Sequence, residues 1–380
     1  MDKVQKQFYE MLSAYFSGNG KSADYSENKE ELKMIARTGM CVPFFVSVAA
    51  NFNVSDAELK KSVMHVVNHN YKNLSVQNIM LDILKENGIK CAVLKGSSVS
   101  CNYPEPILRT HGDIDLLVTP DDYEKAIDVL TGSVKRDKSA LLHGFHYEFH
   151  YEGILVEVHK AISDFDKDED DIKAYLQSAL DETGEKSFEH FSFPVLTESY
   201  QAVTLLQHTK RHYFESELVL KLLLDWAMYI DKVDKAEWNE KVYPTLKTLK
   251  LSDWADAFSS VCEKYLGIEC ADKIQKRIDD SVIEELAEQF ISDRLPKENE
   301  ESLSKEEKIK SAIEKVTSVT EKKFEIVKKH KILLPPLWVY TVLRYFYITG
   351  TGKRRKRNLG KDVVNYNKKV QLYEKMKNTK

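Results

Sequence analysis

Two aspartates with one residue between them are the strongest chemical signal in the sequence. Asp113 and Asp115 belong to the segment DIDLLV, which follows an apolar run, CAVL, and a Lys-Gly-Ser turn. Successive side chains of a strand point to opposite faces, so both carboxylates are expected on one face and Ile114 on the other. Paired acids leaving water cost several kcal/mol unless a cation neutralises them. Because Mg²⁺ prefers carboxylate and phosphate oxygens, the pattern predicts a Mg²⁺ site.

The string from LKG through YPEP to DIDLLV, within residues 93–118, carries a family resemblance. It resembles the uncharacterised bacterial nucleotidyltransferases of nucleotidyltransferase family 5, in the superfamily that includes DNA polymerase β. The gap between Gly-Ser and the first Asp is longer than is typical of the superfamily, and the closer family carries a similar insertion. The resemblance implies an α+β fold with a minimal nucleotidyltransferase mixed-sheet core, N-terminal helices and a large C-terminal α-helical domain.

The resemblance also implies the reaction, which is transfer of NMP from an NTP such as ATP to an acceptor hydroxyl, with release of pyrophosphate. This reaction needs the attacking oxygen, the α-phosphate and the leaving group in line, with their charge neutralised. Two Mg²⁺ ions about 3.5–4 Å apart can hold both oxygens. Three carboxylates are the usual protein contribution, and we predict Asp113, Asp115 and Glu157 as the catalytic and metal-binding set. The family often has an acid followed two residues later by His, as in VEVH (Val156–His159).

Each of these acids also has a structural interpretation. The two aspartates could be solvent-exposed ends of a strand. Glu157 could be a surface acid of an edge strand. His159 shares the expected strand face of Glu157 and is interpreted as a structural neighbour rather than a ligand.

The turn after the first apolar run is the predicted phosphate-binding element. Gly96 lets the backbone approach a phosphate, and the Ser97 hydroxyl and adjacent N–H groups can bind its oxygens. Lys95 either contacts phosphate or brackets the turn. Arg109, four residues before Asp113, either holds a triphosphate with its guanidinium or pairs with an aspartate. Lys95, Gly96, Ser97 and Arg109 are therefore the predicted nucleotide-binding residues.

Several histidines leave two interpretations open. His208 and His212 are four apart on a predicted helix, like a zinc pair, but HTKRH lacks the acid of HExxH. They are interpreted as packing residues, and with Asp225 they could line the cleft. His143, His146 and His150 alternate with aromatic residues in a predicted hairpin. These three are expected to face solvent or the rim of the cleft, with metal binding as the alternative.

The order of patterns along the chain predicts three regions. Residues 1–78 are predicted to be an N-terminal helical region, with a helix that stops near Gly88 before a strand at Ile89–Leu94. Residues 79–165 contain the two-aspartate strand, a helix and an antiparallel hairpin joined at Glu152-Gly153, and form the predicted nucleotidyltransferase core. Residues 166–380 are predicted to be almost wholly helical, with no strand signal after about residue 160.

Composition excludes some classes of protein. The chain has 380 residues, is 42% hydrophobic and 31% charged, and contains no apolar run of about 18 residues, so we expect no membrane span. Its five scattered cysteines form no CxxC pair, which predicts neither a zinc finger nor a disulfide framework, and favours the cytoplasm. Residues 353–380 carry 11 Lys or Arg against two acids. This basic tail is interpreted as a solvated helix, with a nucleic-acid contact possible but not favoured.

Two main function classes remain open on the sequence, and a third hypothesis is RNA modification that uses the basic tail. The first is the Mg²⁺-dependent nucleotidyltransferase, whose partners are an NTP and an acceptor that is a small molecule, a protein or a nucleic acid. The alternative is a non-catalytic nucleotide-binding or regulatory protein, such as one component of a toxin–antitoxin pair. The sequence does not indicate the acceptor, the NTP base or the oligomeric state.

Overall fold

The structure is a computed structural model that describes residues 1–18, 21–134, 141–142, 146–162, 169–215, 218–295, 313, 316–317, 320, 331–341 and 359–378. Contacts divide the chain into two compact units, Met1–Leu295 with Met376–Lys380, and Pro296–Lys375. The sheet and the candidate site belong to the first unit. The predicted region boundaries stay predictions, and residue 78 lies inside a helix. His143 and residues 353–358 of the basic tail lie outside the described residues.

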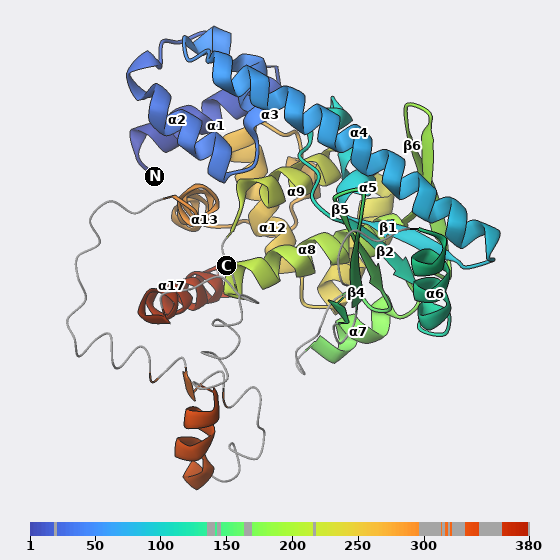
Figure 1. Ribbon diagram of the computed structural model, residues 1–380. Helices are drawn as coiled ribbons and strands as arrows, with labels where there is room; N and C mark the ends of the chain where they lie inside the picture. The colour runs from blue at the N-terminus through green and yellow to red at the C-terminus, as the bar shows by residue number, and fades with distance from the viewer. Residues whose placement is uncertain are drawn as a thin grey trace. The chain divides into compact units, whose positions relative to one another are not determined.

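Four helices precede the sheet in the first unit (Figure 1). They are α1 (Lys3–Phe16), α2 (Lys29–Thr38), α3 (Val42–Val48) and the long α4 (Ala57–Glu86), with 3-10 turns at Ser26–Asn28 and Ala49–Phe52. The α4 helix begins where the Asp56 side chain accepts a hydrogen bond from the N–H of Leu59. It ends before Gly88, whose φ of +66° is the left-handed conformation that glycine adopts readily, as predicted.

A seven-stranded mixed sheet forms the centre of this unit, in the order β3-β4-β5-β2-β1-β7-β6. The strands are β1 (Cys91–Leu94), β2 (Ile114–Val118), β3 (Leu141–Leu142), β4 (His146–Tyr151), β5 (Ile154–His159), β6 (Thr183–Phe188) and β7 (Phe191–Leu196). β1 is antiparallel to β2, and β2 is parallel to β5. Together with the helices around it, the sheet confirms the predicted α+β class.

The predicted hairpin is confirmed as the β4–β5 pair. Its two turn residues, Glu152 and Gly153, both have positive φ, at +50° and +77°. This is the backbone of a two-residue hairpin turn whose twist matches that of the flanking strands. The hairpin pairs His146 with His159 and Glu148 with Glu157.

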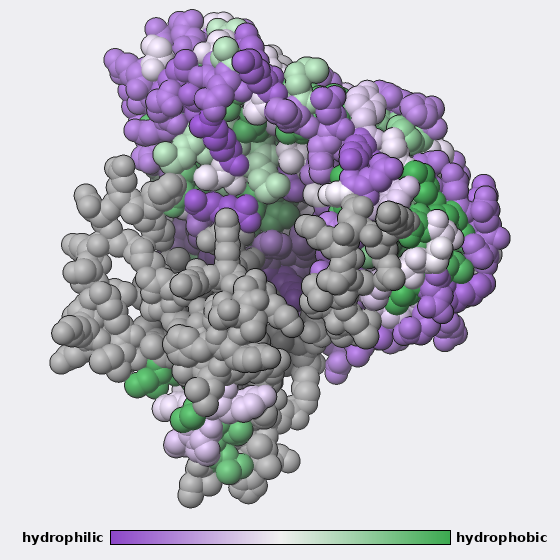
Figure 2. All heavy atoms as spheres, in the orientation of Figure 1, coloured by the Kyte–Doolittle hydropathy of each residue, from purple (hydrophilic) through white to green (hydrophobic). Residues whose placement is uncertain are grey.

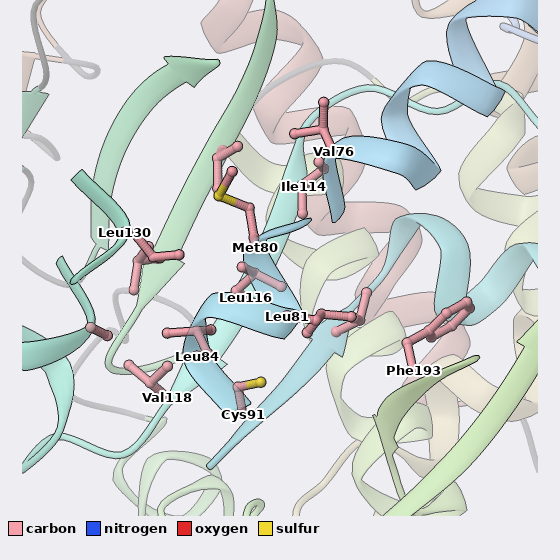
Figure 3. Packing of buried hydrophobic residues seen from close by; sticks show 14 of the residues in the cluster. Val76, Met80, Leu81, Leu84, Cys91, Ile114, Leu116, Val118, Leu130 and Phe193 are labelled. Atoms are coloured by element: carbon pink, nitrogen blue, oxygen red, sulfur yellow. The ribbon is translucent and has the colours of Figure 1, made fainter. Parts of the chain in front are cut away.

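The two faces of the sheet have different chemistry. One face packs against α4 and α6 (Tyr123–Ser133) through the alternate residues of each strand (Figure 3). Its buried cluster includes Met80 and Leu84 of α4, and Leu116, Val156 and Val158 of the sheet. Because strand side chains alternate, the residues between these point to the opposite face. That face carries Asp115 and Glu157, so the apolar core fixes the orientation of the acids.

The prediction that residues 166–380 are almost wholly helical is wrong for β6 and β7. These two strands form an antiparallel pair, and β7 extends the sheet by pairing in parallel with β1 at Val93 and Val195. The sequence signal is weak for a physical reason. β6 (TGEKSF) is a mainly polar edge strand, and β7 contains Pro194, which argues against a strand inside a sheet.

Helices make up most of the described chain after β7, as predicted. They are α8 (Glu198–Glu215), α9 (Leu220–Lys232), α10 (Lys235–Glu237), α11 (Tyr243–Thr248), α12 (Ser252–Val261), α13 (Asp280–Ser292) and α17 (Leu359–Asn378), while α7 (Asp170–Leu176) lies between β5 and β6. Two π-helical segments, Trp238–Val242 and Cys262–Leu266, adjoin α10 and α12, and short 3-10 turns occur at Pro106–Leu108, Ala271–Lys273 and Lys331–Leu333. In the basic tail, α17 buries Leu372 and Met376, so the helix is not wholly solvated.

The face of the molecule seen in Figure 2 is mainly hydrophilic over the described residues, with apolar residues in smaller groups. None of the described helices combines the length and apolar character that crossing a bilayer requires.

Candidate active site

Strand register brings the three predicted acids together. Asp113 immediately precedes β2, and Asp115 lies within it. Across the parallel β2–β5 pair, Asp115 is the partner of Glu157. One carboxylate oxygen from each of the three residues lies within 4.8 Å of the others. The acids therefore share one face and one end of two neighbouring strands.

Three basic side chains contact this acidic trio, and the most distant is His146, whose Nε2 lies 4.0 Å from Oε2 of Glu157. Nζ of Lys95 lies 3.1 Å from Oδ1 of Asp115. Nε2 of His159 lies 3.0 Å from the same oxygen and 3.1 Å from Oε2 of Glu157. Among the described residues, Asp113 makes no ion pair. Asp113 is therefore the carboxylate of the trio that no basic group of the described residues neutralises.

The electrostatics of the trio follow from this arrangement. The negative charge of Asp115, followed by burial, raises the pKa of Asp113 above its ordinary value. Burial opposes the charge on Asp115 as well, but Lys95 and His159 outweigh it and lower the pKa of that carboxyl. Burial would lower the pKa of Lys95, and the surrounding carboxylates raise it instead. The repulsion between Asp113 and Asp115 is what a divalent cation would relieve, and an all-oxygen donor set fits Mg²⁺.

The Lys-Gly turn lies beside the acids because β1 pairs with β2, which places Leu94 opposite Asp115. Lys95 and Gly96 both have φ of +46°, and Gly96 opens the short helix α5 (Gly96–Ser100). A side chain in the left-handed region is strained, and such residues cluster at functional sites. A Cβ on Gly96 would lie 3.9 Å from the carbonyl oxygen of Asp113, so the backbone conformation rather than space favours glycine here.

A cavity of about 210 Å³ opens beside the trio. Its walls come from the Lys-Gly turn, the segment before β2, and the helices α8 and α9. The lining residues are Lys95, Gly96, Arg109, Gly112, Asp113, Asp115, Leu205, His208, Thr209, His212, Lys221, Leu222 and Asp225. Helices α8 and α9 therefore supply one part of this polar cavity, and the Lys-Gly turn and the segment with the two aspartates supply the other.

Arg109 and Ser97 use their polar atoms within the protein. Nε and Nη2 of Arg109 each donate to a different carboxylate oxygen of Asp225, at 2.7 Å, and the Tyr103 hydroxyl donates to Oδ1 of Asp225 at 2.7 Å. All three residues are buried. The Ser97 hydroxyl is also buried and donates to the side chain of Gln77 at 2.5 Å. Of the two interpretations of Arg109, the structure shows the aspartate pair.

The cavity also contains one residue that sequence reasoning missed, Lys221. Its Nζ donates to the carbonyl oxygen of Thr110 at 3.4 Å and has no ion pair among the described residues. Burial, followed by the nearby charge of Arg109, lowers the pKa of Lys221 to about 8. A sequence signal existed, since Lys221 is a lone basic residue in the apolar run LVLKLLL.

His208 and His212 line the same wall and contact each other, with ring centroids 4.6 Å apart. Burial and the charge of Lys95 lower the pKa of His208 well below its ordinary value, which leaves its ring neutral. Their position fits the alternative that they line the cleft, and their mutual ring contact fits the packing interpretation. Asp225 also lines the cavity, although its carboxylate is occupied by Arg109 and Tyr103.

The protein thus has an α+β fold with an acidic group beside a polar cavity. A family model described as "Uncharacterised nucleotidyltransferase" matches residues 32–267, so the chain belongs to this family. A crystal structure of an antigenic nucleotidyltransferase-like protein from Paracoccidioides brasiliensis is similar to it at 16% identity and a TM-score of 0.35, covering 53% of this chain and 93% of that one. No curated protein matches the chain.

Proposed function

We propose that this protein transfers NMP from an NTP to an acceptor hydroxyl in a Mg²⁺-dependent reaction. The observation that carries the proposal is the convergence of Asp113, Asp115 and Glu157 within 4.8 Å of one another, beside the Lys95-Gly96 turn. Mg²⁺ ions at this position would neutralise the reacting phosphate and its leaving group. The three carboxylates would supply the oxygens that hold these ions.

The bond changes are those of in-line phosphoryl transfer. The acceptor oxygen bonds to the α-phosphorus, the bond from that phosphorus to the bridging oxygen breaks, and pyrophosphate leaves. The hydroxyl proton passes to a carboxylate of the trio or to solvent. We assign Asp113 and Asp115 to cation binding, and Glu157 to cation binding or activation of the hydroxyl.

The polyphosphate would lie along the wall formed by Gly96 and Lys221. The backbone at Gly96 can approach phosphate oxygens closely. Lys221 supplies a positive charge to this wall, and no carboxylate among the described residues forms an ion pair with it. Lys95 lies between the metal-binding acids and the phosphate wall, because it contacts Asp115 and also lines the cavity. Arg109 and Ser97 are assigned to supporting the cavity wall and the turn.

The test is incubation of the protein with each labelled NTP and Mg²⁺ in cell extract, followed by detection of labelled acceptor and released pyrophosphate. We expect labelling by the wild-type chain and its loss in Asp113→Asn. Asp121→Asn, which neutralises an exposed aspartate just after β2, is the matched control and should label normally. Tight NTP binding without pyrophosphate release, over a broad acceptor panel, would instead support the non-catalytic alternative.

A further inference from the structure

A second group of potential ligands lies next to the acidic trio and has a different chemistry. It consists of His146 on β4 with Glu157 and His159 on β5. One ligand atom from each of the three lies within 4.8 Å of the others. Two of the three donors are imidazole nitrogens, whereas the trio of Asp113, Asp115 and Glu157 offers only oxygens.

The hairpin register explains why these residues meet. His146 is directly opposite His159, and Glu148 is directly opposite Glu157. Residues opposite each other on one face of an antiparallel pair have neighbouring side chains. Like charges in such a position destabilise the pair, so the Glu148–Glu157 pair needs positive charge nearby. The hairpin therefore gathers two histidines and two acids at the strand end that also holds Asp115.

The distances suit a single ion. Nε2 of His159 lies 3.1 Å from Oε2 of Glu157, and Nε2 of His146 lies 4.0 Å from that same oxygen. Ligands about 2.0–2.2 Å from one ion lie roughly 3–4 Å apart. Oε1 of Glu148 lies 2.8 Å from Nε2 of His146, which places a further carboxylate at the open side of the group. An ion bound by these atoms would take the place of the proton that each imidazole nitrogen shares with a carboxylate in the structure.

We propose that His146, Glu157 and His159 form a second divalent-cation site that takes a transition metal such as Zn²⁺ in preference to Mg²⁺. Imidazole ligands favour Zn²⁺ and its neighbours in the transition series, while sites made only of oxygen suit Mg²⁺. Glu157 belongs to both groups, so it bridges the two cation sites. This inference goes beyond the proposed reaction, because it concerns metal binding and stands whether or not nucleotide is turned over.

Because Glu157 belongs to both groups, metal binding at the histidine site is expected to affect metal binding at the Asp113–Asp115 site. In the structure, Nε2 of His159 contacts Asp115 and Glu157. An ion bound to that nitrogen replaces both contacts and fixes the position of Glu157. Occupancy of the histidine site is therefore expected to change the Mg²⁺ affinity of the Asp113–Asp115 pair, and by linkage Mg²⁺ changes the affinity of the histidine site by the same factor.

The test is calorimetric titration with Zn²⁺ of the full-length chain, first stripped of metal with chelator and then equilibrated with excess Mg²⁺. The wild type should bind one Zn²⁺ that His146→Ala weakens by more than about 100-fold, since mutation of even the outer partners of a metal site costs 10- to 100-fold. His146→Cys, which supplies another Zn²⁺ ligand, should retain binding. His150→Ala removes an imidazole from the same strand but outside the group, and should leave the titration unchanged.

Asp113→Asn separates this proposal from the proposed function. It removes an oxygen ligand of the first site only, so Zn²⁺ binding should persist while Mg²⁺-dependent labelling by NTP is lost. Thermal unfolding of each variant with chelator present checks that the fold is retained. Equal Zn²⁺ affinity in the wild type and in a folded His146→Ala, or no Zn²⁺ binding by the wild type in excess Mg²⁺, would overturn the proposal. His159 would then be only the basic partner of Asp115 and Glu157.

Discussion

Two groups of charged side chains each contribute residues to the same cavity and are built in opposite ways. In one, Arg109, Tyr103 and Asp225 satisfy one another, with both carboxylate oxygens of Asp225 accepting hydrogen bonds at 2.7 Å. In the other, Lys95, His159 and His146 contact Asp115 and Glu157, while Asp113 has no ion pair among the described residues. The first group is complete within the protein, while the second is complete only with added positive charge.

The difference separates a supporting ion pair from a candidate site. A buried pair with full hydrogen bonding joins two segments, here the loop before β2 and helix α9, and breaking it leaves an uncompensated charge. Strongly perturbed, unbalanced titratable groups in a cleft are typical of functional sites. Removing a charge from the first group should therefore damage the fold, and removing one from the second should damage function.

The largest effect is expected from Asp113→Asn on nucleotidyl transfer. Loss of a member of a catalytic set should lower the rate of pyrophosphate release by about 10⁴-fold, or about 5.4 kcal/mol of transition-state stabilisation. The free energy of unfolding in chelator should stay the same or rise, because repulsion from Asp115 raises the pKa of Asp113 and so disfavours its ionised form. A clear loss of stability would place Asp113 with the supporting charges instead.

Arg109→Leu is expected to lower the stability of the fold rather than to act on catalysis directly. It leaves Asp225 buried without its cation, and we expect the free energy of unfolding to fall by about 3–5 kcal/mol in denaturant titration. The double variant Arg109→Leu with Asp225→Leu should recover most of this loss, because a buried pair exchanged for apolar residues is often neutral. If the double variant were as unstable as the single one, the pair would not be the cause.

Lys221→Met should weaken NTP binding with little effect on the fold. A hydrogen bond to a charged group contributes about 1.5–3 kcal/mol, so the dissociation constant should rise about 10- to 100-fold in calorimetry. Lys221→Arg keeps the charge and should retain most of the affinity. An unchanged dissociation constant in Lys221→Met would remove this residue from the proposed phosphate wall.

The pH dependence of the same residue has a definite sign. Lys221 is protonated below its pKa of about 8, so NTP binding should weaken as pH rises above 8, and Lys221→Arg should flatten this dependence. Because burial lowers the pKa from 10.5, the unfolded chain holds the proton more tightly between about pH 8 and 10.5. Wild-type stability relative to Lys221→Met should therefore rise with pH in that window.

The smallest effect is expected from Gly96→Ala. At φ of +46° a side chain is strained, and the free energy of unfolding should fall by roughly 1 kcal/mol. The matched control is Gly132→Ala in helix α6, where nothing lies within 4 Å of an added Cβ. There alanine should stabilise the helix by roughly 0.5–1 kcal/mol. Thermal or denaturant unfolding of the two variants tests the difference in sign.

Local sequence patterns were enough to predict the central part of the fold. Alternating residues predicted the β4–β5 hairpin, and the glycine at position 88 predicted the end of α4. Those signals depend on short-range geometry, which the residues themselves encode. β6 and β7 were missed, because a polar edge strand and a strand with Pro194 find their partners only through the rest of the sheet.

The sequence by itself determined the residue types of the acids and of the glycine turn, and alternation predicts that Asp113 and Asp115 share a face. The pairing of β1 with β2 then places them beside Lys95 and Gly96. Tertiary structure decided which charges are already neutralised. The pairing of Arg109 with Asp225, 116 residues away, and the approach of Lys221 to the same cavity depend on how α9 packs against the loop before β2. Contacts between residues so far apart in the sequence form only when the buried faces of their elements pack together. Close packing of the interior, and not a local sequence pattern, determines which residues meet.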